Sequence, residues 1–145
     1  MGFSVKLTVK GRVEKVNDSE RLPVGDFIRR QVGCEIFETV RVQGLKQGFF
    51  LLVDEMGLYR EKPFINPFAS WLYKYQDHGQ PIVGDALVMK TVWTSDGPDI
   101  GFLDENEADF LVAWLNERKT IMARDVMNAL SRYDHDAITE DSDNV

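Results

Sequence analysis

The apolar run FFLLV at residues 49–53 is the feature that most constrains the fold of this chain. Turn-forming residues bound it, because QG comes directly before it and DEMG directly after it. A continuous apolar run of this length is typical of a strand that is covered on both faces. An alternating segment, CEIFETVRV at residues 34–42, precedes it across a glycine-containing loop. Together the two segments predict a hairpin over residues 34–54, with its second strand in the middle of a sheet.

Other parts of the first hundred residues also have strand patterns. FSVKLTVK at residues 3–10 alternates apolar and polar side chains, and GRVEKVND at 11–18 is expected to pair with it. IVGDALVMKTVW at 82–93 predicts a strand interrupted at Gly84 and Asp85, which we interpret as a bulge. IGFL at 100–103 predicts a short final strand.

Two short helices are expected to pack on this sheet. The first covers residues 23–32, opening with a proline and ending at Gly33. The second begins at NPFASWLY, where Asn66 can cap the helix and Pro67 suits its first turn. The prediction is an α+β fold, a single small antiparallel or mixed sheet with short helices packed on it, that forms a core domain over residues 1–103.

A C-terminal helical extension is predicted over residues 104–133. Asp104 followed by Glu107 is a capping-box pattern. The helix is either one long element or a pair with a break near Thr120. Residues 134–145 contain five acids between Asp134 and Asp143 and predict an acidic disordered tail. The stripe of side chains expected to be buried is Phe110, Leu111, Trp114 and Leu115.

Charge and cysteine content limit the function. The chain has a net charge of −7, and residues 61–145 alone carry seven Lys and Arg against sixteen Asp and Glu. Such an acidic half repels phosphate, so we expect no direct binding of nucleic acid. The single cysteine excludes an internal disulfide. No apolar run is long enough for a membrane helix, and the alternating N-terminus does not resemble a signal peptide, so a cytoplasmic protein is expected.

Carboxylates and helix-start residues are the candidate binding groups. Asp54 and Glu55 leave the buried strand together, and Asp85 interrupts a later strand; each could bind a ligand, or serve only its turn. Asn66, Ser70 and Tyr73 could present polar groups near the second helix start, although Asn66 is also the expected cap. Aromatic side chains crowd the same segment, more than one helix face can bury, and predict an interface or a stacking platform: Phe64, Phe68, Trp71, Tyr73 and Tyr75.

No motif in the sequence predicts catalysis. There is no P-loop, no dinucleotide fingerprint and no serine elbow. The two histidines, His78 and His135, have no partner at a ligand spacing. We therefore expect no enzyme activity, no cofactor and no metal site.

Three motifs resemble an uncharacterised family of domains of unknown function from Gram-positive bacteria, their plasmids and their phages. They are VDEMGL, INPFASWLY and IVGDALV, which are similar to the family patterns VDExGL, NPxAS and IVGxxLV. The similarity covers roughly residues 24–90. It implies a small α+β domain in a mobile-element setting and brings no activity or catalytic residue with it.

The resulting hypothesis is a small cytoplasmic, non-enzymatic binding protein that inhibits a host defence system, such as an anti-phage or restriction system, by binding a protein. The surface expected to do so runs from Asp54 across Asn66, Trp71 and Tyr73 to Asp85. The helical extension could also join copies into a homo-oligomer.

Three alternatives remain open from the sequence. The chain could be a sponge that holds a nucleotide-like signalling molecule between aromatic rings and helix-start amides. It could be an acidic DNA mimic that uses residues 104–109 and the tail. It could also be an enzyme that uses Asp54, Glu55 and Asp85.

Overall fold

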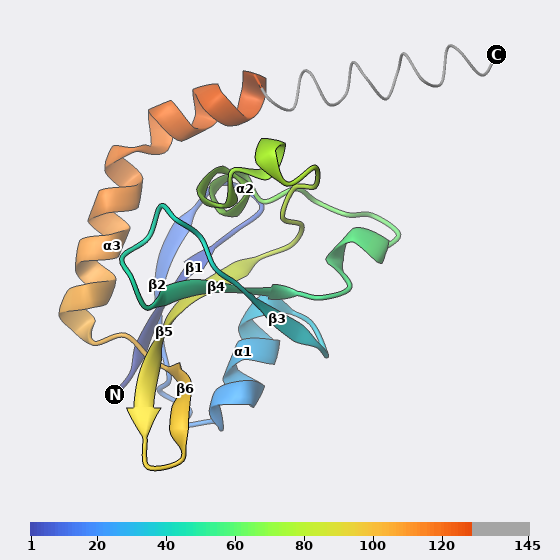
Figure 1. Cartoon of the computed structure of the whole chain (residues 1–145). Coiled ribbons are helices and arrows are strands. Elements are labelled where there is room, and N and C mark those ends of the chain that lie inside the picture. Colours follow the sequence, from blue (N-terminus) through green and yellow to red (C-terminus); the bar gives the residue numbers. More distant parts are fainter. Residues whose placement is uncertain (129–145) are drawn as a thin grey trace.

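The computed structural model describes residues 1–128, and in them six strands form one sheet whose neighbours are all antiparallel. The strand order is β2-β1-β5-β4-β3, and β6 pairs with the far end of β5 (Figure 1). The predicted α+β fold is confirmed. The strands are β1 (Phe3–Leu7), β2 (Val13–Asn17), β3 (Phe37–Val40), β4 (Phe49–Asp54), β5 (Ala86–Thr94) and β6 (Gly97–Gly101). The helices are α1 (Val24–Val32), α2 (Pro67–Tyr73) and α3 (Glu105–Glu117), with 3-10 turns at Gly57–Tyr59 and Tyr75–Asp77.

The two faces of the sheet are covered by different helices (Figure 1). α1 packs on one face, where it buries Phe27 and Ile28 against Leu52 of β4. α2 and α3 cover the opposite face, where Phe68 and Leu115 share a cluster with side chains of β1, β4 and β5. β4 is therefore a central strand buried on both faces, as its apolar run predicts, and it pairs with β3 and β5.

Several strand predictions need correction. The final strand, predicted over residues 100–103, is β6 at Gly97–Gly101. β5 begins only at Ala86, so Gly84 and Asp85 precede the strand and do not form a bulge within it. Gly84 has a φ of +85°, a conformation that favours glycine, and this turns the chain into β5. β3 begins at Phe37, which leaves Ile36 outside the strand and 55% exposed, although its carbonyl still accepts from the N–H of Glu55 at 3.1 Å.

The C-terminal extension breaks into two helical segments. α3 ends at Glu117, Arg118 lies in a turn, and residues 119–128 are again helical, so the break falls slightly before the expected position. Met122 and Val126 of the second segment belong to the same hydrophobic cluster as the sheet. Phe110 contradicts the predicted stripe, because it is 71% exposed. The rest of the predicted extension and the whole acidic tail lie outside the described residues.

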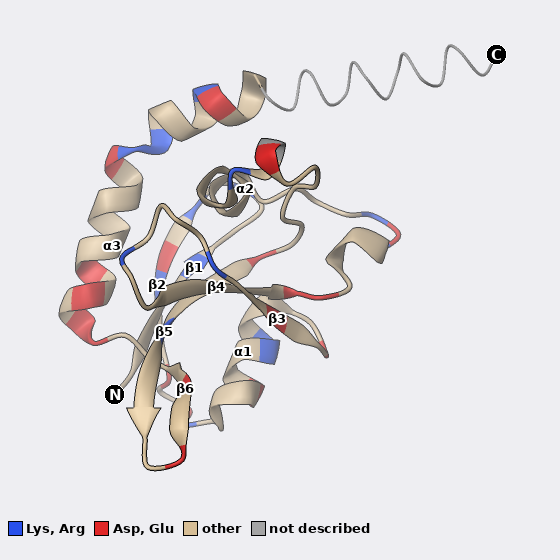
Figure 2. Ribbon diagram, in the orientation of Figure 1, with Lys and Arg blue, Asp and Glu red and all other residues tan. Residues whose placement is uncertain are grey.

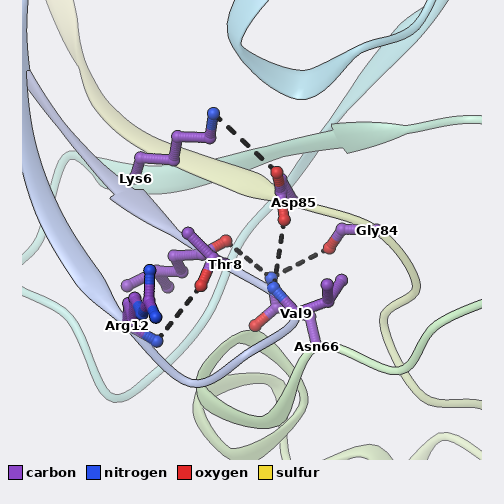
Figure 3. A network of polar contacts seen from close by, with 8 residues as sticks. Lys6, Thr8, Val9, Arg12, Asn66, Gly84 and Asp85 are labelled. Atoms are coloured by element: carbon purple, nitrogen blue, oxygen red, sulfur yellow. Dashed lines mark hydrogen bonds and ion pairs between the residues drawn. The ribbon is translucent and has the colours of Figure 1, made fainter.

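Asn66 connects the elements that meet at the start of α2. Its side chain is fully buried, and its Oδ1 accepts a hydrogen bond from the backbone N–H of Ala69 at 3.1 Å, which caps α2 as predicted. Its Nδ2 donates to the carbonyl oxygens of Leu7 at 2.8 Å and Gly84 at 2.9 Å. The same region holds Asp85, whose carboxylate accepts from the N–H of Val9 (Figure 3). One amide side chain therefore fastens α2 to the end of β1 and to the approach to β5.

Replacing Asn66 with Ala should lower the free energy of unfolding by about 3 kcal/mol, because it removes a helix cap and takes the amide donor from one buried and one partly buried carbonyl. Urea denaturation measures this change. Asn17→Ala is the control, since the exposed Asn17 side chain makes a local bond, accepting from the N–H of Ser19 at 3.0 Å, and we expect a loss of about 0.5 kcal/mol or less. Equal losses in the two variants would contradict the role assigned to Asn66.

Candidate functional site

Asn66 and Ser70, two of the predicted site residues, are fully buried and bonded within the fold. The Ser70 hydroxyl donates to the carbonyl oxygen of Ile82 at 3.2 Å and accepts from its N–H at 3.0 Å. With the Asn66 amide also fully engaged, α2 offers neither of these side chains to a ligand.

Two of the three predicted carboxylates, Asp54 and Asp85, are already bonded within the fold. Asp54 accepts from the N–H of Met56 and from Nε of Arg60, both at 2.9 Å, and its side chain is 9% exposed. Asp85 accepts from Val9 and lies 3.8 Å from the Lys6 ammonium. Glu55 is exposed. Asp54 and Glu55 share a small hollow of about 100 Å³ with Tyr73, and Asp85 does not line it.

The crowded aromatic side chains do not form a common platform. Phe68 and Tyr75 are buried, whereas Phe64 is 64% exposed. The Trp71 indole N–H donates to Asp125 at 3.1 Å, and the Tyr73 ring stacks on His78 with 4.2 Å between ring centroids. Trp71 therefore serves to hold the second C-terminal helical segment against α2.

A larger hollow lies elsewhere, between α3 and the loop that joins β3 to β4. It has a volume of about 670 Å³, and we call it the α3 groove. The α3 wall consists of Asn106, Glu107, Phe110, Leu111 and Trp114. The loop wall consists of Gly44, Leu45 and Lys46, together with Phe49, the first residue of β4. Both walls are mostly apolar.

The capping box fixes the α3 wall. Asp104 accepts from the N–H of Glu107 at 2.8 Å, and Glu107 accepts in return from the N–H of Asp104 at 2.9 Å. The Glu107 carboxylate also binds the Lys90 ammonium of β5 at 2.6 Å. Four-residue spacing then places Phe110 and Trp114 on the flank of α3 that faces the groove.

The loop wall is held by α2 and carries a cation. A side chain at Gly44 would come within 3.1 Å of Leu72, so the loop lies directly on α2. Leu45 is buried, and the Lys46 ammonium lies 5.8 Å from the centroid of the Phe49 ring. Across the groove, the Arg118 guanidinium lies 4.0 Å from the centroid of the Trp114 ring. The groove therefore offers aromatic surface with positive charge at two of its rings.

Sequence reasoning missed this groove because it assigned Phe110 and Trp114 to a buried stripe. Helical periodicity shows which residues share a face, but the width of the covered stripe depends on where the neighbouring loop lies. One signal in the sequence could have indicated this exposure. Phe110 and Trp114 lie at one edge of the apolar stripe, where covering by neighbouring elements is least complete.

No protein-family model, curated protein or solved structure matches this chain. The resemblance to the family of Gram-positive bacteria and phages stays a prediction. Among residues 1–128, no helix is long and apolar enough to cross a membrane. Within the same part of the chain, no group of three or more His, Cys, Asp or Glu side chains could hold a metal ion.

The capping box makes α3 sensitive to acid. The N–H of Glu107 lowers the pKa of Asp104, and a lowered pKa stabilises the fold above the unfolded-state value of about 3.9. This stabilisation is lost as the pH falls through the folded-state pKa. Asp104→Ala should therefore lower the free energy of unfolding at pH 7. The gap in free energy of unfolding between the variant and the unsubstituted chain should become smaller as the pH falls below about 4. Urea denaturation at several pH values measures this difference, and a constant difference would contradict the account.

Proposed function

We propose that this chain is a cytoplasmic, non-enzymatic binding protein that acts by holding a partner protein in the α3 groove. The observation that carries the proposal is Phe110, a side chain 71% exposed at the wall of an apolar groove of about 670 Å³.

The energetics favour a partner at this place. Covering a side chain such as Phe110 contributes about 1.5 to 3 kcal/mol to binding, and aromatic anchors near apolar pockets dominate many protein interfaces. Trp114 and Phe49 add further aromatic surface beside it. The α3 wall needs little reorganisation on binding, because the capping box and the Lys90 ion pair already hold it.

The resemblance to a family of mobile elements supports a setting for this activity. Small proteins of such elements often block host defences, so we propose that the bound partner belongs to a host defence system. In that setting binding alone is sufficient for inhibition, and no catalytic group is needed.

A nucleotide-like ligand is the second candidate occupant. The groove volume lies within the roughly 300 to 1,000 Å³ typical of small-molecule sites. Its rings could stack on a base, and Lys46 could meet phosphate oxygens. Native mass spectrometry of the purified protein distinguishes this candidate, since a sponge would retain a ligand of nucleotide mass that a Phe110→Ala variant loses.

The DNA-mimic alternative has weaker support. Asp104 and Glu107 are engaged in the capping box, and Glu105 and Asp109 both bind Lys15 of β2, at 3.2 and 2.7 Å. Hydrogen bonding to Asp109 and Glu105 raises the pKa of Lys15, and this one cation offsets part of their negative charge.

Phe110→Ala should strongly reduce capture of the partner from a lysate of host cells. We expect the unsubstituted chain to retain at least one host protein. The variant should capture about tenfold less of it or lower still, because a central aromatic anchor of the interface is lost. Quantitative mass spectrometry of the captured proteins measures this change. Because Phe110 is exposed, its replacement should change stability by about 0.5 kcal/mol or less.

Trp93→Ala is the matched control for this experiment. Trp93 is also an exposed aromatic, at 79%, but it lies on the β5–β6 hairpin outside the groove. If the same proteins are captured with and without Phe110, or if Trp93→Ala removes them equally, the α3 groove is not the binding surface.

A further inference from the structure

The loop that forms one wall of the α3 groove is positively charged, and its Lys46 lines the groove. Residues 41–48 between β3 and β4 contain Arg41 and Lys46 and no acidic residue. Figure 2 shows blue segments but no red ones on this loop. Neither side chain has an ion-pair partner among residues 1–128.

The acids of the facing helix do not balance this charge. Glu107, the one acid that lines the groove, is paired with Lys90 at 2.6 Å. Glu105 and Asp109 are paired with Lys15 of β2 and so lie on the other flank of α3. The groove side of α3 is thus close to neutral, and the loop opposite is positive.

The net charge of −7 does not cancel this local field. At physiological ionic strength the screening length is about 8 Å, so a group bound in the groove is affected mainly by the charges at its rim. Lys46 lies against the Phe49 ring, which places a positive charge beside the apolar lining. The complementary ligand therefore combines a negative group with an apolar side chain.

The geometry points to an acidic segment of a partner protein as the occupant of the α3 groove. An aromatic or large aliphatic side chain of this segment packs beside Phe110 and Trp114, while a carboxylate of the segment faces Lys46. This inference rests on the proposed function and specifies the chemistry of the partner.

Selection from a random peptide library displayed on yeast tests this inference without knowledge of the partner. Peptides are selected on the full-length protein, and those that also bind the Phe110→Ala variant are removed. The peptides that remain should carry an aromatic or large aliphatic residue and a net negative charge. Peptides that depend on Phe110 but are neutral or basic would overturn the inference and leave the proposed function standing. If no peptide depends on Phe110, the proposed function itself fails.

Charge reversal at one position supplies the second measurement. Lys46→Glu should weaken binding of the selected peptides about fivefold or more, because an attraction becomes a repulsion. Lys10→Glu makes the same change in net charge at an exposed position of the β1–β2 turn, and its effect should stay within about twofold. Equal effects of the two variants would mean that only net charge matters, and the inference would be wrong.

Discussion

The hydrogen bonds of the buried Asn66 amide are the interaction on which the rest of the structure depends. They join α2 to the end of β1 and to the residue before Asp85, so the short helix is fixed to the sheet from its first turn. α2 in turn supports both sides of the α3 groove. Its Leu72 lies against Gly44 of the loop wall, and its Trp71 binds Asp125 of the segment that follows α3. Loss of the Asn66 hydrogen bonds would therefore disturb the α3 groove, although Asn66 itself does not line it.

The features that could be predicted from sequence are those with local causes. The run from Phe49 to Val53 indicates a buried strand, because no exposed element tolerates so many consecutive apolar residues. Asn66 and Pro67 indicate a helix start, and Asp104 with Glu107 indicates another, since each cap forms between residues three positions apart or fewer. Alternation likewise indicated the pairing of β1 with β2, which are neighbours in the chain.

The candidate site could not be predicted because it depends on contacts between distant segments. Asp54 and Asp85 look available in the sequence, but Arg60 engages one, and Val9 and Lys6 engage the other. Ser70 is taken by Ile82, a residue beyond the end of its helix. Conversely, Phe110 looks buried in the sequence and is exposed in the fold. The groove arises only where the loop from β3 to β4 stops short of covering the edge of α3.

Site-specific photo-crosslinking tests the central claim, that a partner protein occupies the α3 groove, most directly. A photoreactive phenylalanine analogue is introduced at position 110 in cells that contain the partner, and the products of irradiation are separated by mass. We predict a discrete adduct with one protein from position 110 and none from the same probe at position 93 on the β5–β6 hairpin. The absence of an adduct at position 110, or the same adducts from both positions, would contradict the account.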